Sequence, residues 1–240
     1  MWIKADLKDR SKTVVILCAG EGHRLEELGR QIPKAMAKVK DKPIINYVID
    51  FWLPFAKRFI FVVGYKKEQI IAYVNSLGLT QEVFFVEQDS PKGIAHALSC
   101  AQDKISGDDF ALVLGDCLCR GEFLFPDSFF QGVGVWRTGN ENYIKQGYSI
   151  EISGDFVSKV VEKPKELKND LCGMGYYFFN RAVFDYIHST PASSLRNEVE
   201  ITDVIQKMID NQKQVYPVYF RGDYLNVTSA GDVKIAEQIL

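Results

Sequence analysis

The sequence lacks an excess of charge of either sign. It has 29 Lys and Arg against 31 Asp and Glu, a net charge of -2. No chain-wide basic field exists to hold a polyanion, so we expect no nucleic-acid partner. Long apolar runs are missing too, and residues 1–12 are charged without an apolar core. We therefore expect no secretory signal, no membrane-spanning helix and no membrane partner.

Cysteine and histidine are scarce, at five and three residues. No CxxC pair occurs, and the CxC of Cys117 and Cys119 has no second ligand pair, so a zinc site is not expected. The number of cysteines is odd and their surroundings are apolar. These features predict reduced thiols in a cytoplasmic protein.

What is present is the composition of one globular domain: 240 residues, of which 47% are hydrophobic and 25% charged. In the first half, short apolar runs alternate with helical patterns, which is typical of a doubly wound, mainly parallel α/β sheet. The predicted strands there are 13–18, 59–63, 83–86 and 110–114, and the predicted helices are 43–55, 67–75 and 93–102.

The second half has more strands and fewer helices, which predicts a mixed extension of the sheet. The predicted strands are 132–137, 147–152, 157–161, 173–179 and 215–220, the helices are 181–188, 200–210 and 230–240, and 163–170 is a surface loop.

A glycine-bearing loop, Ala19-Gly20-Glu21-Gly22, follows the first predicted strand. Glycines permit a close backbone approach to a ligand, and successive N–H groups form an anion-binding nest. Arg24 adds a fork of donors suited to phosphate, and Lys34 can fold back across the loop. Two other readings stay open at this point: an ordinary strand-to-helix turn, or a dinucleotide loop, which Leu25 opposes because a third glycine is wanted there. No Gly-Lys-Ser/Thr triplet of a P-loop occurs.

Together with Pro33-Lys34 and residues 41–44 (DKPI), residues 19–25 (AGEGHRL) resemble the opening of the sugar-1-phosphate nucleotidyltransferases, whose pattern is G-x-G-T-R-L, then P-K, then K-P. His23 stands where that family often has threonine. The resemblance implies a Rossmann-like nucleotidyltransferase fold with a small sugar-binding sheet extension. It also implies that the glycine loop, Arg24 and Lys34 hold the triphosphate.

The resemblance continues through residues 87–97 (EQDSPKGIAHA), which look like the family's base-reading segment. A glutamine amide has one donor face and one acceptor face, which suits the edge of uracil or thymine. The resemblance assigns this contact to Gln88, and Gly93 would admit the base because it has no side chain.

Two positions are predicted to hold Mg²⁺. Asp116 ends an apolar strand in the motif L-G-D, and ligand sites of such sheets lie at the carboxyl ends of strands. Mg²⁺ prefers oxygen ligands and takes few from the protein. The family's last motif has aspartate where this chain has Asn226, whose amide oxygen still ligates but adds no charge. A weakened or inactive site is therefore an open alternative.

The sugar-phosphate side is implied by further matches to the family: E-K-P at 162–164, G-x-G-Y at 173–176 and R-x-E-x-E-I-T-D at 196–203. We read Thr202 and Asp203 as a helix cap. The residues assigned to sugar-phosphate binding are Gly147, Glu162, Lys163, Gly175 and Glu198.

The predicted activity transfers a nucleotidyl group from UTP or dTTP to a sugar 1-phosphate, with Arg24, Lys34, Asp116 and Lys163 as catalytic residues. Residues 1–240 would form a single domain, with 13–137 mainly binding nucleotide and 138–240 mainly binding sugar phosphate. The alternatives are cytidylyl transfer to another phosphorylated or phosphonate acceptor, or a catalytically degenerate nucleotide-binding homologue. Nothing in the sequence fixes the oligomeric state, so a homo-oligomer stays open.

Overall fold

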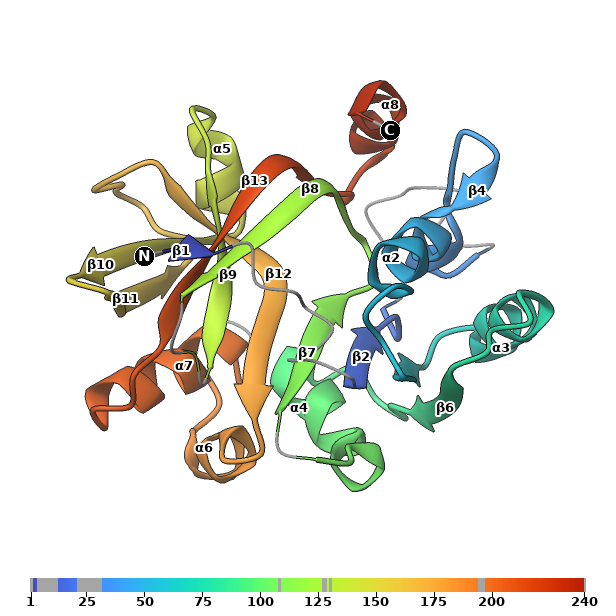
Figure 1. The fold of residues 1–240 in the computed structure, drawn as a ribbon, viewed down its shortest axis with the longest axis horizontal. Coiled ribbons are helices and arrows are strands. Elements are labelled where there is room, and N and C mark those ends of the chain that lie inside the picture. Colours follow the sequence, from blue (N-terminus) through green and yellow to red (C-terminus); the bar gives the residue numbers. More distant parts are fainter. Residues whose placement is uncertain are drawn as a thin grey trace.

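The computed structural model describes residues 2–3, 13–20, 32–107, 109–126, 129, 131–193 and 197–239. Its main element is an eleven-stranded mixed sheet in the order β1-β8-β13-β9-β12-β7-β2-β5-β6, with β10 and β11 attached through β12 (Figure 1). The strands of this sheet are β1 (Trp2–Ile3), β2 (Thr13–Leu17), β5 (Arg58–Val63), β6 (Glu82–Glu87), β7 (Asp109–Leu114), β8 (Cys117–Pro126), β9 (Gly132–Arg137), β10 (Tyr148–Ser153), β11 (Phe156–Glu162), β12 (Leu171–Asn180) and β13 (Tyr216–Asn226).

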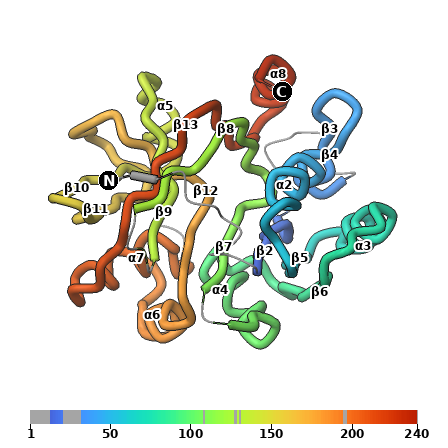
Figure 2. The backbone as a smooth tube through the Cα atoms, viewed as in Figure 1, coloured from blue at the N-terminus to red at the C-terminus, as the bar shows by residue number. Residues whose placement is uncertain are grey.

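The helices lie on both faces of the sheet and around its upper rim in Figure 2. They are α2 (Ile44–Trp52), α3 (Lys67–Ser76), α4 (Gly93–Cys100), α5 (Glu141–Gln146), α6 (Val183–Ser189), α7 (Ile201–Asp210) and α8 (Ala230–Ile239), with short 3-10 turns η3 (Lys34–Met36) and η4 (Gln102–Lys104). Two short strands, β3 (Lys38–Val39) and β4 (Lys42–Pro43), form a separate hairpin.

Within residues 13–137, the predicted nucleotide half, four parallel strands lie side by side in the order β6-β5-β2-β7. The chain leaves β2 toward β5 and β6, then returns to the other side of β2 as β7. Where the connections that follow two neighbouring parallel strands run in opposite directions, a crevice opens at the carboxyl ends of the strands. Ligands of α/β sheets bind in this crevice. This crevice lies between the residues that follow β2 and those that follow β7.

Side chains alternate between two cores along these strands. Val15 faces α4, α6 and α7, whereas Val14 and Ile16 face α2 and α3. Because both faces of the strands are covered, their sequences are apolar throughout rather than alternating. A third cluster, which includes Val39 and Ala236, packs the β3–β4 hairpin against α8.

The second half extends the sheet with mostly antiparallel pairs. β12 pairs with β7 and β9, and β13 lies between β8 and β9, parallel to β9 and antiparallel to β8. The predicted doubly wound α/β fold with a mixed extension is confirmed. The predicted boundary between 137 and 138 stays a prediction; β13, which lies after it, pairs with β8 and β9, which lie before it.

Several predicted elements need correction. Helix 43–55 is shorter: it spans Ile44–Trp52, and Pro43 is its extended N-cap in β4. Thr202 and Asp203 do not cap α7, because Glu200 is the N-cap residue and Thr202 is buried within the helix. The sequence reading also omitted the long strand β8 and the short helix α5.

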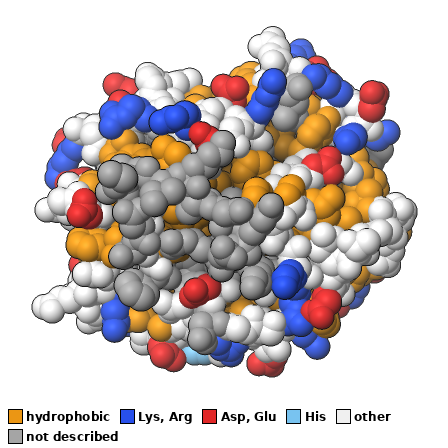
Figure 3. Space-filling view, in the orientation of Figure 1, with side chains coloured by type: hydrophobic (Ala, Val, Ile, Leu, Met, Phe, Trp, Pro, Cys, Tyr) orange, Lys and Arg blue, Asp and Glu red, His pale blue; other side chains and the backbone are white. Residues whose placement is uncertain are grey.

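Among the described residues, no helix is long and apolar enough to cross a membrane. All five cysteines are free, as the sequence predicts. On the face drawn in Figure 3, lysine and arginine side chains are interspersed with acidic ones.

Candidate nucleotidyl-transfer site

A pocket of about 430 Å³ lies at the crevice beside β2 and β7. Its walls come from the ends of both strands, the start of α4, and residues of β10 to β13. The predicted site residues that line it are Ala19, Gly20, Lys34, Gln88, Gly93, Asp116, Gly147, Glu162, Lys163, Gly175, Glu198 and Asn226. Glu21, Gly22 and Arg24 lie outside the described residues, so their placement stays a prediction.

Ala19 and Gly20 are held at the pocket by the neighbouring strand. The backbone N–H of Tyr65 donates to the carbonyl of Ala19 at 3.2 Å, and Cys18 N–H donates to Val62 at 2.9 Å. Gly64 faces the same turn, where an added Cβ would lie 3.0 Å from the Cβ of Ala19. The start of the glycine loop is thus fixed by close backbone packing.

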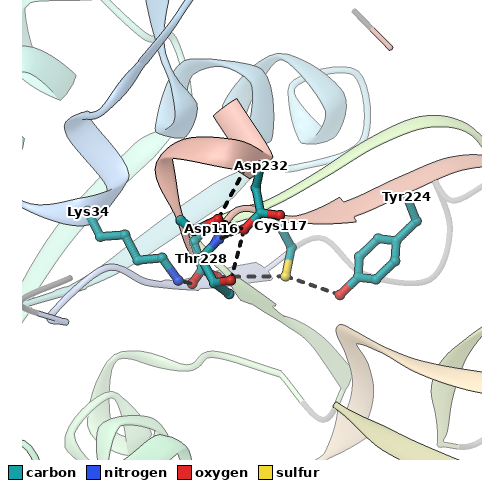
Figure 4. Close-up of polar contacts among 7 residues, drawn as sticks. Lys34, Asp116, Cys117, Tyr224, Thr228 and Asp232 are labelled. Atoms are coloured by element: carbon teal, nitrogen blue, oxygen red, sulfur yellow. Dashed lines mark hydrogen bonds and ion pairs between the residues drawn. The ribbon is translucent and has the colours of Figure 1, made fainter. Parts of the chain in front are cut away.

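Lys34 and Asp116 form an ion pair on the pocket wall. Lys34 opens η3 after the extended Pro33, and its ammonium reaches the carboxylate of Asp116 (Figure 4). The two side chains are only 16% and 20% exposed, respectively. At this burial each charge depends on its partner, because losing one would leave the other unpaired in a poorly solvated site.

Asp116 and Asn226 meet where β7 leads into β8 and where β13 ends. Asn226 is paired in register with Cys117, and Val227 N–H donates to the Asp116 carbonyl at 2.9 Å. Within the described part of the chain, the buried Oδ1 of Asn226 has no hydrogen-bond partner. An orphaned buried amide oxygen close to a carboxylate is a donor set that fits a hard divalent cation.

A metal ion held by Asp116 and Asn226 would have few other ligands from the protein. Across the described ranges, no group of three or more His, Cys, Asp or Glu side chains is placed to hold a metal. This composition suits Mg²⁺, which takes one or two protein oxygens and fills its remaining positions with water and phosphate oxygens.

Tyr224 contacts Cys117, the residue after Asp116, through its hydroxyl group. Its hydroxyl accepts a hydrogen bond from Gly175 N–H at 2.9 Å and lies 3.2 Å from the thiol of Cys117. Figure 4 shows that thiol between Tyr224 and Asp116. Burial raises the pKa of Tyr224 and of Cys117 well above their ordinary values, so both stay protonated. A Cβ on Gly175 would lie 2.6 Å from the Cys117 Sγ, so this glycine is required by packing.

The predicted sugar-phosphate side gathers around the end of β11. Lys163 N–H donates to the Gly147 carbonyl at 2.8 Å, and Lys163 adopts a left-handed φ of 44°. A non-glycine residue in this conformation is strained, and such strain concentrates at functional sites. Thr202 Oγ1 lies 3.5 Å from Glu162 Oε2, which links α7 to this corner.

Gln88 and Gly93 form the predicted base-binding wall. Gly93 starts α4 with a φ of 83°, and an added Cβ would lie 2.8 Å from Glu198 Oε2. The Gln88 side chain is 8% exposed and lies 3.3 Å from the Gly93 carbonyl and 2.9 Å from His96 Nδ1, both measured from its Nε2.

Sequence reasoning missed Asp232, which also lines the pocket. Its Oδ2 accepts hydrogen bonds from the backbone and hydroxyl groups of Thr228 and Ser229 at 2.7 to 2.9 Å. Ser229 Oγ in turn accepts from Asp232 N–H at 3.3 Å, so the pair forms a capping box for α8. The S-x-x-D spacing of Ser229 and Asp232 is the sequence signal that could have predicted this capping box. Other lining residues that the prediction omitted include Tyr143, Gln146, Tyr148 and Glu200.

The architecture defines an α/β fold of doubly wound type, with its pocket at the switch point of the sheet. The sequence matches the profile of the nucleotidyl transferase family over residues 13–227. The chain belongs to this family.

Two curated relatives illustrate the similarity. UTP–glucose-1-phosphate uridylyltransferase AglF of Haloferax volcanii is 30% identical over 233 residues, with 94% of this chain and 95% of that protein covered. The bifunctional protein GlmU of Methanococcus maripaludis is 30% identical over 230 residues, which cover 91% of this chain. The chain spans nearly all of AglF but only about half of GlmU, at 52%.

Solved structures confirm the fold. A UDP-glucose pyrophosphorylase complexed with UDP-glucose superposes with a TM-score of 0.79 at 21% identity, covering 95% of this chain and 97% of that one. The inositol-1-phosphate CTP transferase from T. maritima gives 0.81 at 19% identity, covering 97% and 96%. At these identities the likeness shows the fold alone.

Proposed function

We propose that this nucleotidyltransferase transfers a nucleotidyl group from UTP or dTTP to a sugar 1-phosphate, giving an NDP-sugar and pyrophosphate. The observation that carries the proposal is that one pocket joins three groups of residues: the glycine turn at Gly20, the Lys34–Asp116 pair, and the Glu162–Lys163 corner. The name of AglF, a relative matched over nearly its whole length, supports the same reaction.

We also propose that Mg²⁺ is the cofactor and that Asp116 and Asn226 hold it, because they supply a carboxylate and an otherwise unpartnered amide oxygen. When bound there, the ion would neutralise charge on the phosphates of the nucleotide. Asn226 contributes no charge of its own, so the electrostatic part of the binding would depend on Asp116.

The chemistry needs positioning rather than a proton acceptor. The phosphate of a sugar 1-phosphate is already an anionic nucleophile, and it repels the triphosphate that it must attack. Lys34 and Lys163 both line the pocket and would lower this repulsion. In this proposal, Lys34 acts at the triphosphate together with Arg24, and Lys163 acts at the sugar phosphate. The attacking phosphate oxygen forms a bond to the α-phosphorus while the bond to pyrophosphate breaks.

Lys163 is well suited to that role. It is exposed to the pocket, and no ion pair within the described residues holds its ammonium. By contrast, Lys34 is engaged by Asp116. The pocket thus offers one cation that is already paired and one that is available to an incoming anion.

Free thiols support a cytoplasmic location, since five unpaired cysteines fit a reducing compartment. Localisation of a tagged full-length chain with a reporter fused at its C-terminus would test this part of the proposal. Export of the reporter out of the cytoplasm would contradict it.

A pyrophosphate-release screen tests the activity. UTP, dTTP, CTP, ATP and GTP would each be combined with a panel of sugar 1-phosphates and of other phosphorylated or phosphonate acceptors, with and without Mg²⁺. We expect release only with Mg²⁺, a sugar 1-phosphate, and UTP or dTTP. Release with CTP and a different phosphorylated acceptor would favour cytidylyl transfer. A folded protein that binds nucleotide but releases no pyrophosphate with any pair would be a degenerate homologue.

A further inference from the structure

The side-chain amide of Gln88 has its orientation set by two acceptors. Gln88 follows β6 and is 8% exposed, and its Nε2 lies 3.3 Å from the carbonyl oxygen of Gly93. A carbonyl oxygen only accepts hydrogen bonds, so the NH₂ end of the amide must face it. The same Nε2 lies 2.9 Å from Nδ1 of His96.

This arrangement determines the tautomer of His96. An NH₂ group has only donors, so Nδ1 must be the acceptor and the proton of the neutral ring must lie on Nε2. Gly93 and His96 both belong to the first turn of α4. One helical turn therefore takes both N–H groups of the Gln88 amide.

The remaining oxygen of that amide is left for a ligand. Within the described part of the chain, no hydrogen bond reaches Gln88 Oε1, yet it is not among the buried atoms without partners. Gln88 lines the pocket and His96 does not. The accessible part of the amide is thus its acceptor, while its donors point back into the protein.

The base-binding wall therefore differs from the sequence-based interpretation, in which Gln88 used a donor face and an acceptor face together. A pure acceptor recognises a ring N–H. Uracil and thymine present such a donor at N3, whereas cytosine presents a lone pair at the same position. Two facing lone pairs repel and leave a buried acceptor unsatisfied, which costs more than a missing hydrogen bond.

We propose that His96 is a positioning residue for nucleotide selection: it holds the Gln88 amide with its oxygen toward the pocket, so that the site accepts a uracil or thymine nucleotide and rejects a cytosine nucleotide. This inference rests on the proposed function, because that proposal places a pyrimidine against Gln88. It adds the residue that decides between pyrimidines.

Substitutions at His96 separate positioning from simple packing. His96→Ala removes the nearer of the two acceptors, so the amide is held only by the Gly93 carbonyl at 3.3 Å and can rotate more easily. His96→Asn places its Oδ1 near the position of the imidazole Nδ1 and restores an acceptor. His96→Gln fills similar volume, but its Oε1 reaches farther, near the position of Nε2. His188, exposed on α6 and outside the pocket lining, offers the matched control His188→Ala.

The measurement is the ratio of the dissociation constants of CTP and UTP, obtained by calorimetry on the full chain at fixed Mg²⁺ without sugar phosphate. We expect the wild type to favour UTP and His96→Ala to lower the ratio by about tenfold. His96→Asn and His188→Ala should keep the wild-type ratio, and His96→Gln should resemble His96→Ala. Thermal unfolding of each variant checks that it is folded.

An unchanged ratio in a folded His96→Ala variant would overturn the proposal, as would equal binding of UTP and CTP by the wild type. Equal ratios for the Asn and Gln variants would also overturn it, since packing alone would then explain both. Because binding is measured without turnover, a wild type that prefers UTP but releases no pyrophosphate would support this inference while refuting the proposed function.

Discussion

The backbone N–H of Val227 donates a hydrogen bond to the carbonyl oxygen of Asp116 at 2.9 Å. This contact joins the turn after β7 to the end of β13, two segments far apart in the sequence. Asn226, the residue before Val227, pairs in register with Cys117, the residue after Asp116, and both Asp116 and Asn226 line the pocket. A backbone hydrogen bond thus fixes the turn that carries Asp116 against the end of β13.

Asp116→Asn should abolish most activity and leave the fold intact. The substitution keeps the shape of the side chain but removes the charge that pairs with Lys34 and would bind Mg²⁺. We expect pyrophosphate release to fall at least about 100-fold. The control is Asp50→Asn, which removes one partner of the Lys42–Asp50 pair, whose side chains are 54% and 50% exposed. Wild-type turnover in Asp116→Asn would refute the metal assignment.

Asn226→Asp should make stability depend more strongly on Mg²⁺. Without metal, a second carboxylate beside Asp116 would repel the first and lower the free energy of unfolding by about 1–2 kcal/mol. With Mg²⁺ the added charge should become favourable, so the metal-induced rise in unfolding temperature should exceed that of the wild type. Asn140→Asp, at the exposed N-cap of α5, adds the same charge away from the pocket. An identical Mg²⁺ response in all three proteins would contradict this assignment.

Gly93→Ala should weaken nucleotide binding, whereas Gly107→Ala should not. The two glycines have φ values of 83° and 86°, so both substitutions carry the same left-handed strain, about 1 kcal/mol. Only at Gly93 does the added Cβ meet a neighbour, the Glu198 carboxylate at 2.8 Å; nothing lies within 4 Å at Gly107. UTP calorimetry measures the difference. Equal affinities in the two variants would show that the Gly93 wall is not a base contact.

Lys163→Ala should raise the KM for the sugar phosphate about tenfold and leave UTP affinity nearly unchanged. The reason is that its ammonium is available to an incoming phosphate, whereas Lys34 is paired with Asp116 and is proposed to act on the triphosphate. Lys159→Ala, exposed on β11 and outside the pocket lining, removes the same charge nearby. An equal loss of affinity for UTP and for the sugar phosphate would argue against placing Lys163 at the sugar phosphate.

We expect Asp232 to make the free energy of unfolding depend on pH in the acidic range. Burial raises its pKa, but hydrogen bonds from Thr228 and Ser229 outweigh this and hold the pKa below the ordinary value. Since the carboxyl group takes up protons more readily in the unfolded chain, its contribution is complete above the ordinary pKa of about 4. That contribution is lost as pH falls through the lowered value.

Asp232→Ala should therefore cost about 1 kcal/mol at pH 7 through loss of the capping box, and less below pH 3. Denaturant unfolding of wild type and variant from pH 7 to pH 2.5 measures the difference. Glu237→Ala removes an exposed acid from the same helix and serves as the control. A constant difference across this range would show that the hydrogen bonds to Asp232 do not depend on its charge.

Much of the fold follows from local pattern. The strands β2, β5 and β7 are predictable because their apolar runs are buried on both faces, which leaves a continuous hydrophobic signal. β8 was missed because its buried residues are interrupted by the exposed Arg120 and Gly121, so neither alternation nor a continuous run is visible. The helix α5 was missed because it is short, polar, and buries only Ile144.

Site residues were predictable where the type of side chain and its place in a motif indicate a chemical role. Lys34 and Asp116 are examples, and they lie together in the pocket. It was not predictable where a role depends on a partner's orientation. The two hydrogen bonds that fix the Gln88 amide need α4 in place, so the direction of its donors cannot be read from residues 87–97. Asp232 resembles an ordinary helix-surface acid until α8 is seen to begin beside the pocket.

The position of β13 has a consequence for biosynthesis. This strand is inserted between β8 and β9, although it is translated long after both of them. Until it emerges from the ribosome, the edges of β8 and β9 that it will occupy lack their partner, and Asn226 is not yet beside Asp116. Such long-range pairing is slow and leaves strand edges exposed to association with other chains. Nascent chains that stall before residue 216 should therefore be recognised by chaperones and should not bind nucleotide.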